Sequence, residues 1–343
     1  MKALVLKEYN RFEYEEVPIP AIMNNDVLIQ VKACGICGSD VHGMDGSTGR
    51  RIPPLIMGHE ASGIIVDTGA EVTQLKNGDW VTFDSTIYCG VCYFCKRGNI
   101  NLCDNRRVLG VSCDEYRQHG AFAEYVAVPQ HIVYPLPDRL SFEHASMVEP
   151  LSVAFHAVGR TPKSLNDTAV VVGSGMIGLL TIQALRAAGC GTIIAVDIDK
   201  GRLEQAKELG ADIGLSSGSD NITAEIRRVT GGRGADIAFE IVGNTPAFKT
   251  SLASLHKGGH LTLVGNLSPE IEMSLQSVVT REITMYGSCA SCGEYPACLD
   301  MMARGAVNVD ALISATAPLS EGASWFQRLY DREPGLMKVI LKP

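Results

Sequence analysis

The chain has 343 residues, of which 46% are hydrophobic and 20% are charged, and its formal net charge is −8. This composition is typical of a folded globular protein and excludes an intrinsically disordered one. The length exceeds that of one ordinary domain, so we expect two domains. The negative balance argues against binding to nucleic acid or to an anionic membrane. We find neither a secretory leader nor an apolar run long enough to span a bilayer, so we expect a cytoplasmic protein.

Short runs of alternating apolar and polar residues fill the first part of the chain, from Lys2 to about Pro135. Alternation places every second side chain in a core. It predicts strands at residues 26–33, 63–67, 79–83 and 120–128. Many short strands separated by Gly and Pro predict a compact, barrel-like β domain. A further strand is expected at residues 337–342, where it could rejoin this domain.

One short loop holds four of the 11 cysteines, namely Cys89, Cys92, Cys95 and Cys103. An odd cysteine count in a chain without a leader argues against a disulfide framework and favours reduced thiols. Three cysteines at every third position, with a fourth one loop later, allow one segment to wrap a Cys₄ zinc site. Such a site leaves no position for water, so this loop predicts a structural zinc. The alternative is four unrelated thiols, which their density on a polar segment disfavours.

A second possible metal site combines the Cys37 thiol, the His59 imidazole and the Glu60 carboxylate. Catalytic zinc takes three protein ligands of these kinds and keeps one position open. The alternative is that Cys37 is a small buried side chain and that His59 and Glu60 end a strand. Ser39 and His42 lie between these residues and could move a proton, because imidazole titrates near neutral pH. The alternative for both is hydrogen bonding within the loop.

Glu149 lies among apolar residues in a segment that we expect to be helical from Leu140 to Val158, with Ser141 as its N-terminal cap. Burying an unpaired carboxylate is costly. Glu149 therefore has a cation partner or faces water at a rim. We interpret it as a fourth group at the catalytic metal, bound directly or through water.

The periodicity changes at Thr168–Val172, a continuous apolar run that is typical of a parallel strand covered on both faces. A Gly-x-Gly-x-x-Gly motif follows at once, with Gly173, Gly175, Ile177 and Gly178 as candidate cofactor contacts. A helix is expected directly after it. Strand, glycines and helix in this order predict a dinucleotide site, because the glycines let the backbone approach a pyrophosphate at the helix N-terminus.

The next predicted strand, at residues 192–196, is followed by Asp197. A carboxylate at this point can accept hydrogen bonds from the adenosine ribose and repels a 2′-phosphate. Asp199 adds to that repulsion, so NAD is favoured over NADP. Arg202 is a further candidate cofactor contact, although it and Lys200 could instead form a solvated first helical turn.

Further strands are predicted at residues 213–216, 235–242, 260–265 and 282–287, and a helix at residues 295–304. Ligands of such folds bind at the carboxyl ends of the strands. The turns there should line the cofactor site, with Val242, Val264, Gly265, Asn266, Ser288 and Cys289 as candidate contacts. Cys289 and Cys292 form a Cys-x-x-Cys pair, which we interpret as packing rather than as a metal or redox site.

These motifs together resemble those of the zinc-dependent medium-chain alcohol dehydrogenases over essentially the whole chain. They are Gly35–His42, Gly58–Glu60, the four-cysteine loop, Val148–Leu151 and the glycine motif. Glu149-Pro150, in place of a third cysteine ligand, is similar to the polyol (sorbitol, L-iditol) dehydrogenase branch. The resemblance implies that Cys37, His59 and Glu60 hold a catalytic zinc, with Glu149 near it through water.

The resemblance also implies an α/β fold in two domains. A GroES-like catalytic domain would comprise residues 1–153 and 290–343, and a Rossmann NAD-binding domain with a doubly wound parallel sheet would comprise residues 154–289. Two zinc ions per chain and a homo-oligomer, a tetramer or else a dimer, follow from the same resemblance.

The expected reaction is zinc-dependent oxidation of a secondary alcohol (a polyol, diol or sugar alcohol) to a ketone, with hydride transfer to NAD. Sorbitol dehydrogenases carry an Arg-Tyr pair that anchors substrate hydroxyls, where this chain has Ala290-Ser291. Threonine dehydrogenase, sugar-phosphate (galactitol-1-phosphate-like) dehydrogenase and butanediol dehydrogenase therefore stay open. A non-enzymatic NAD-binding protein and a zinc-free quinone reductase are the remaining alternatives, and the complete ligand set disfavours both.

Overall fold

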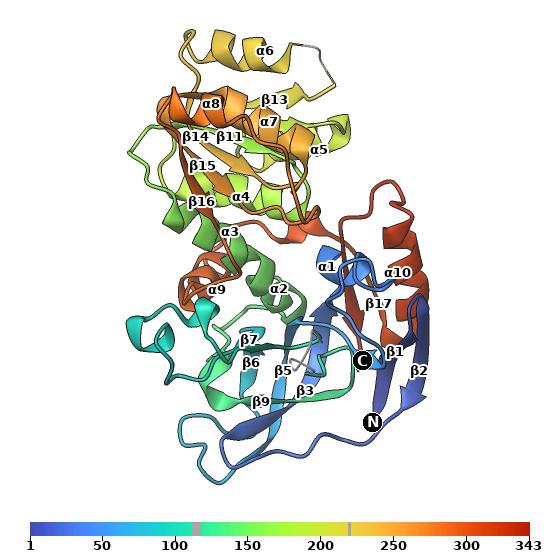
Figure 1. Ribbon diagram of the computed structural model, residues 1–343. Helices are drawn as coiled ribbons and strands as arrows, with labels where there is room; N and C mark the ends of the chain where they lie inside the picture. Colours follow the sequence, from blue (N-terminus) through green and yellow to red (C-terminus); the bar gives the residue numbers. More distant parts are fainter. Residues whose placement is uncertain (112–117, 219–220) are drawn as a thin grey trace. The chain divides into compact units, whose positions relative to one another are not determined.

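The computed structural model of the protein describes residues 1–111, 118–218 and 221–343 (Figure 1). The chain divides into two compact units. The first comprises Met1–Glu149 and Cys292–Pro343, and the second comprises Pro150–Ser291. The boundaries implied by the sequence resemblance are 153/154 and 289/290. Among the described residues, no helix has both the length and the apolar composition needed to cross a membrane.

The first unit is built on a seven-stranded sheet with β3 (Asp26–Gly35) near its centre. Alternate residues of β3 are buried over most of its length, as its sequence pattern predicts. Antiparallel partners of β3 are β5 (Glu60–Thr68), β9 (Tyr125–Pro129) and, from the far end of the chain, β18 (Lys338–Lys342). The other strands of this sheet are β6 (Trp80–Phe83), β10 (Val133–Pro135) and β17 (Ile313–Pro318).

Both chain ends contribute to the core of this unit. Leu4 of β1 (Lys2–Glu8) and Leu341 of β18 are buried in one cluster with Phe122 and with Phe326 of α10 (Gly322–Tyr330). The Phe122 and Phe326 rings meet edge to face, with centroids 5.6 Å apart. Each such side chain removed from water contributes roughly 1.5–3 kcal/mol, so the terminal segment is an integral part of the unit.

Shorter elements complete the first unit. A three-stranded sheet contains β1 (Lys2–Glu8), β2 (Arg11–Glu16) and β4 (Leu55–Ile56), and a two-stranded one contains β7 (Thr86–Ile87) and β8 (Arg107–Val108). Besides α10, its helices are α1 (Gly38–Val41), α2 (Phe142–Ser146) and α9 (Tyr295–Ala303), with short 3₁₀ turns at Cys95–Arg97, Ile100–Leu102, Gln130–Ile132, Asp310–Leu312 and Leu319–Glu321.

The strand predicted at residues 120–128 is correct only in its second half. The backbone amides of Gly120, Ala121 and Phe122 instead donate to the carbonyls of Ile56, Gly58 and Met57. A Cβ at Gly120 would lie 2.2 Å from the Gly58 oxygen, so only glycine permits this approach. The segment thereby supports the backbone directly before His59.

The helix predicted from Leu140 to Val158 is interrupted at Met147. It forms α2 and then α3 (Val148–Arg160). The predicted cap is confirmed, since the Ser141 hydroxyl accepts from the His144 amide at 3.1 Å. The interruption has a physical reason in Pro150, which lacks an N–H and is tolerated only in a first helical turn.

The second unit contains a six-stranded sheet with the order β13-β12-β11-β14-β15-β16, and all its pairs are parallel. The strands are β11 (Thr168–Val172), β12 (Thr192–Asp197), β13 (Ile213–Ser216), β14 (Ala235–Glu240), β15 (Leu255–Leu263) and β16 (Thr284–Gly287). The helices are α3, except for its first residues, α4 (Met176–Ala187), α5 (Lys200–Glu208), α6 (Ile222–Val229), α7 (Thr245–Ser254) and α8 (Leu275–Val279).

The strand order reverses between β11 and β14, which makes their carboxyl ends a topological switch point. This is the doubly wound arrangement predicted from the glycine motif, and Figure 1 shows helices packed along this sheet. Ala169, Val170 and Val171 of β11 are fully buried, as a strand covered on both faces requires.

Two helical glycines of the second unit should respond in opposite ways to alanine. At Gly178, in α4, a Cβ would lie 1.8 Å from the Gly173 carbonyl oxygen, whereas at Gly159, in α3, it would meet nothing within 4 Å. We expect Gly178→Ala to destabilise the protein by roughly 1–3 kcal/mol. Gly159→Ala should stabilise it by about 0.5–1 kcal/mol. Denaturant unfolding measures both, and equal effects would contradict the close approach at Gly178.

Candidate metal centre and cofactor site

The three residues of the proposed catalytic zinc site come together in the first unit. The ligand atoms of Cys37, His59 and Glu60 all lie within 4.8 Å of one another. Cys37 is the N-cap of α1, and Glu60 is the first residue of β5. Because Gly35 of β3 pairs with Glu60, the two segments leave their strands at the same place. Strand register therefore brings together residues that are far apart in the sequence.

The backbone before His59 is fixed by a glycine in the left-handed region. Gly58 has a φ of +94°, and a Cβ there would lie 2.9 Å from Cys34 Sγ and from the Phe122 backbone nitrogen. A side chain at this position would displace the neighbours that hold His59 in place.

His59 is oriented by a buried carboxylate that the sequence motifs did not single out. Asp40 Oδ2 lies 3.5 Å from His59 Nδ1, and Asp40 Oδ1 accepts from Arg51 Nη2 at 2.8 Å. The carboxylate thus faces Nδ1 of the imidazole, and the other nitrogen, Nε2, is available as a ligand. Asp40 closely follows Cys37 in the chain. An acidic residue this close to a predicted metal ligand was the sequence signal that could have identified Asp40 as a partner of the site.

Burial would raise the pKa of Asp40, but His59 and Arg51 outweigh it and lower the pKa. For His59 the signs are reversed. Burial alone would lower its pKa, yet Asp40 and Cys37 raise it well above the usual value. The surroundings of this imidazole therefore favour positive charge.

Glu60 is paired with a lysine from the other end of the chain. Lys338, the first residue of β18, donates from Nζ to Glu60 Oε2 and, at 3.0 Å, to the Ile36 carbonyl. Lys338 is 2% exposed and Glu60 is 1% exposed. Burial would lower the pKa of Lys338, but Glu60 and Cys37 raise it. No sequence signal could have linked two residues this far apart in the chain.

The charges and open atoms of this group fit a divalent cation. Glu60 Oε1 is buried and has no hydrogen-bond partner within the described part of the chain. The carboxylates of Asp40 and Glu60 are balanced by Arg51 and Lys338, so a Cys37 thiolate would add negative charge beyond these pairs. Zinc takes a thiolate, an imidazole and a carboxylate oxygen, which are the atoms present.

Glu149 is not part of the group of three ligand atoms. Its Oε1 accepts from the Ser85 hydroxyl at 3.4 Å. Burial, reinforced by Glu60 and Asp84 against the effect of His59, raises the pKa of Glu149 to about 7. The charges of His59 and Glu60 therefore influence Glu149, although Glu149 does not belong to the ligand group.

The two candidate proton carriers differ in their contacts. The Ser39 hydroxyl donates to Cys37 Sγ at 3.2 Å and accepts from Arg51 Nη2 at the same distance. His42 ends α1, where its carbonyl accepts from the Ser47 hydroxyl at 2.9 Å, and its side chain is exposed. Ser39 therefore touches the ligand set, and His42 is open to solvent.

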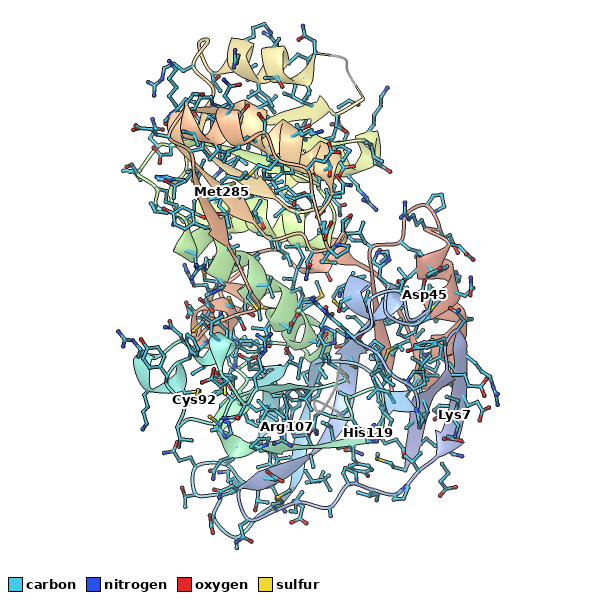
Figure 2. All side chains as sticks on the ribbon, viewed as in Figure 1. Lys7, Asp45, Cys92, Arg107, His119 and Met285 are labelled. Atoms are coloured by element: carbon cyan, nitrogen blue, oxygen red, sulfur yellow. The ribbon has the colours of Figure 1, made fainter. Side chains whose placement is uncertain are left out.

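The four cysteines of the predicted loop also come together, with their sulfur atoms within 4.8 Å of one another. Figure 2 labels Cys92 on this loop. Cys103 Sγ accepts from the backbone amides of Cys89 and Asn105, each at 3.3 Å. Backbone amides, with help from the Asn105 side chain, lower the pKa of Cys89 to about 6. Amides directed at sulfur stabilise thiolates, the form that binds zinc.

In the second unit the glycine motif forms a tight turn between β11 and α4. Gly173 has a φ of +101°, and Gly175 is the N-cap of α4 without a side-chain cap. Uncapped amides at a helix N-terminus are available to a phosphate. Ile177 follows in the first turn of α4.

Asp197, at the end of β12, is held beside this turn. Its Oδ2 accepts from the Ser174 amide at 2.6 Å and its Oδ1 from the Asp199 amide at 2.9 Å. Asp199 caps α5 by accepting from the Arg202 amide at 3.1 Å. A Cβ at Gly175 would lie 3.9 Å from Arg202 Nη1, so this guanidinium lies near the glycine turn.

The turns after β14 and β15 approach each other closely, since a Cβ at Gly265 would lie 2.1 Å from the Gly243 nitrogen. Glu240, which the sequence motifs did not single out, accepts from the Val242 and Gly243 amides at 2.8 Å. A small cavity of about 100 Å³ is lined by Glu240, Gly243, Leu263, Gly265, Ser268, Pro269, Glu270 and Ile271. Val264 and Asn266 flank Gly265 in the same turn.

Ser288 and Cys289 follow β16, and the Ser288 amide donates to the Leu263 carbonyl at 3.0 Å. Cys289 is exposed. Cys292, the other half of the Cys-x-x-Cys pair, lies in the first unit and donates from Sγ to the Gly98 carbonyl at 3.1 Å.

Family comparisons agree with this geometry. Residues 23–138 match the alcohol dehydrogenase GroES-like domain, and residues 177–304 match the zinc-binding dehydrogenase domain. The chain belongs to the zinc-dependent medium-chain alcohol dehydrogenases. The predicted family and fold class are thereby confirmed.

Three relatives illustrate the range of this family. The dehydrogenase is 35% identical to a sorbitol dehydrogenase of Bacillus subtilis (strain 168), over 100% of this chain and 97% of the relative. It is 33% identical to a D-arabitol-phosphate dehydrogenase of Enterococcus avium, over 94% and 92%. A crystal structure of a zinc-binding dehydrogenase from Sinorhizobium meliloti 1021, bound to NADP, matches with a TM-score of 0.91 and 31% identity, over 100% and 99%.

Single substitutions should distinguish the catalytic role proposed for Cys37 from the structural role proposed for the four-cysteine loop. Cys37→Ser should abolish turnover but leave cofactor binding and unfolding nearly unchanged, because the pairs Arg51–Asp40 and Lys338–Glu60 hold the surrounding backbone. Cys92→Ser should lower the free energy of unfolding by roughly 3 kcal/mol or more, because the loop has little apolar material to fold on.

Metal analysis of the purified variants checks this prediction. Each substitution should reduce zinc from about two ions per chain to about one. An active Cys37→Ser variant, or a Cys92→Ser variant as stable as the unmodified dehydrogenase, would contradict the two assignments.

Proposed function

We propose that this dehydrogenase oxidises a secondary alcohol of the polyol class to a ketone and transfers hydride to NAD. The supporting observation is the convergence of Cys37, His59 and Glu60, with one Glu60 oxygen unpaired among the described residues, in a chain that also forms a dinucleotide-type glycine turn. Two zinc ions per chain belong to the proposal, one at these residues and one at the four-cysteine loop. A homo-oligomer, which rests on the resemblance of the sequence motifs, and a cytoplasmic location belong to it as well.

When bound, zinc supplies Lewis-acid polarisation, which lowers the pKa of an alcohol hydroxyl. Cys37, His59 and Glu60 would hold the ion, with Glu149 near it through water. Asp40 keeps the His59 ring in the required orientation, and Lys338 neutralises the Glu60 carboxylate.

The residues of the loop move the proton. The Ser39 oxygen accepts the hydroxyl proton of the alcohol while the Ser39 proton moves outward to the exposed His42 imidazole, which passes a proton to solvent. When bound, the nicotinamide would accept the hydrogen of the alcohol carbon together with both electrons of the C–H bond. The balance is a ketone, a reduced cofactor and one released proton.

The cofactor preference rests on Asp197. Its carboxylate is held beside the glycine turn by two amides, where a ribose 2′-phosphate would meet negative charge. Arg202 acts in the opposite direction, since a guanidinium near Gly175 could pair with a phosphate. We propose that the fixed carboxylate dominates and that NAD is preferred over NADP.

The substrate is proposed from the relatives and from one departure. The polyol class is supported by the sorbitol dehydrogenase relative. Ala290-Ser291, in place of an anchoring Arg-Tyr pair, argues for a substrate held by other groups. A sugar phosphate is the second candidate and is favoured by the D-arabitol-phosphate dehydrogenase relative.

Steady-state assays decide between these candidates. Reduction of NAD and of NADP should be measured with sorbitol, xylitol, 2,3-butanediol, threonine and galactitol 1-phosphate. We expect turnover with a polyol and at least about tenfold higher kcat/KM with NAD, the factor that about 1.4 kcal/mol of repulsion gives. Higher kcat/KM with the phosphate would favour the second candidate. Absence of turnover with every alcohol in zinc-replete protein would refute the proposed function.

His42→Ala tests the proton path. We expect kcat at neutral pH to fall about 10²-fold, since general acid–base groups contribute 10²–10⁴. Activity should recover as pH rises, because hydroxide can then take the proton. His144→Ala is the matched control, since His144 is paired with Asp310 at 3.1 Å and is not among the ligand residues. A pH–rate profile that is unchanged in His42→Ala would remove His42 from the path.

A further inference from the structure

Arg51 is a buried cation that lies directly behind Ser39. It is 3% exposed, and its Nε and Nη2 donate to Asp40 Oδ1 at 3.1 and 2.8 Å. The same Nη2 donates to the Ser39 hydroxyl oxygen at 3.2 Å. One guanidinium therefore bridges the carboxylate that orients His59 and the hydroxyl beside Cys37.

These contacts determine the direction of the Ser39 hydroxyl. A guanidinium can only donate, so the Ser39 oxygen must be the acceptor. The single Ser39 proton then points elsewhere, and Cys37 Sγ lies 3.2 Å from the oxygen. The same sulfur accepts from the Ser39 amide at 3.4 Å. A hydroxyl oxygen has two lone pairs, so the second one can accept from a further donor such as a substrate alcohol.

The surroundings hold Arg51 in this position. A Cβ at Gly43 would lie 2.5 Å from Arg51 Cγ and 3.0 Å from the Ser39 carbonyl oxygen, so the absence of a side chain at Gly43 makes room for the arginine stem. Asp40 is fully buried, which fixes the charged end. Because the planar guanidinium already binds two partners, it loses little further conformational freedom during the reaction.

We propose that Arg51 is a positioning residue for the Ser39 hydroxyl. Because the guanidinium donates to the Ser39 oxygen, the Ser39 proton can point only toward Cys37 Sγ or outward along the proton path. This inference rests on the proposed function. In that function Arg51 does not touch the substrate and acts only through the Ser39 hydroxyl. Its role is to occupy one lone pair of the Ser39 oxygen, so that the hydroxyl proton points away from the guanidinium.

The test is a double-mutant cycle between Arg51 and Ser39 in the zinc-loaded dehydrogenase. Arg51→Lys keeps the charge but lacks the fork that reaches both partners. We expect kcat to fall about tenfold, the factor that loss of one charge-assisted hydrogen bond gives, with KM for NAD unchanged. In a Ser39→Ala background the same substitution should change kcat less than about twofold, because the hydroxyl it positions is gone.

Arg50→Lys, at the exposed neighbouring arginine, is the matched control and should leave kcat unchanged. A general effect on folding would give the same tenfold loss in both backgrounds, and that additive result would overturn the inference.

A spectroscopic readout separates this inference from the proposed function. In protein with cobalt(II) at Cys37, His59 and Glu60 and zinc kept at the four-cysteine loop, the thiolate-to-metal absorption reports hydrogen bonding to Cys37. We expect Arg51→Lys to shift this absorption when Ser39 is present and to leave it unshifted in the Ser39→Ala background. An unshifted absorption with Ser39 present would overturn the inference even in a fully active dehydrogenase. Absence of turnover together with the expected shift would instead refute the proposed function alone.

Discussion

The first unit depends on balancing the buried negative charges of Asp40 and Glu60. Asp40 and Glu60 are almost completely enclosed, and each is matched by one cation, Arg51 or Lys338. Unmatched buried carboxylates would cost several kcal/mol each. The pairs leave His59 and one Glu60 oxygen close to Cys37. A metal ion would therefore complete an arrangement whose other charges are already balanced.

The fold brings these charges together by pairing strands from distant parts of the chain. β3 ends at Gly35, just before Cys37, and β5 begins at Glu60 beside it. β18 supplies Lys338, the partner of Glu60, and also pairs with β3. The closing segment of the chain is thus needed for the site as well as for the core. This explains how a unit interrupted by an entire nucleotide-binding fold can still act as one structure.

Local motifs were predictable from the sequence, and long-range partners were not. The four cysteines and the glycine turn follow from residue types at fixed short spacings, so their local arrangement could be predicted directly. Lys338 and Arg51 are ordinary cations in sequence, and only the strand pairing and the space at Gly43 give them partners. The two wrong element predictions have the same origin. Residues 120–124 do alternate in polarity, but the amides at the start of this segment bond to the backbone before His59. Periodicity alone would continue the helix from α2 into α3, but the helix is interrupted shortly before Pro150.

The proposed role of Cys37, His59 and Glu60 depends on a zinc ion bound between them. X-ray diffraction from crystals of the zinc-loaded protein, recorded on both sides of the zinc absorption edge, would locate such an ion. We expect two anomalous peaks per chain, one bounded by Cys37, His59 and Glu60 and one inside the four-cysteine loop. A single peak, at the loop alone, would contradict the proposed role.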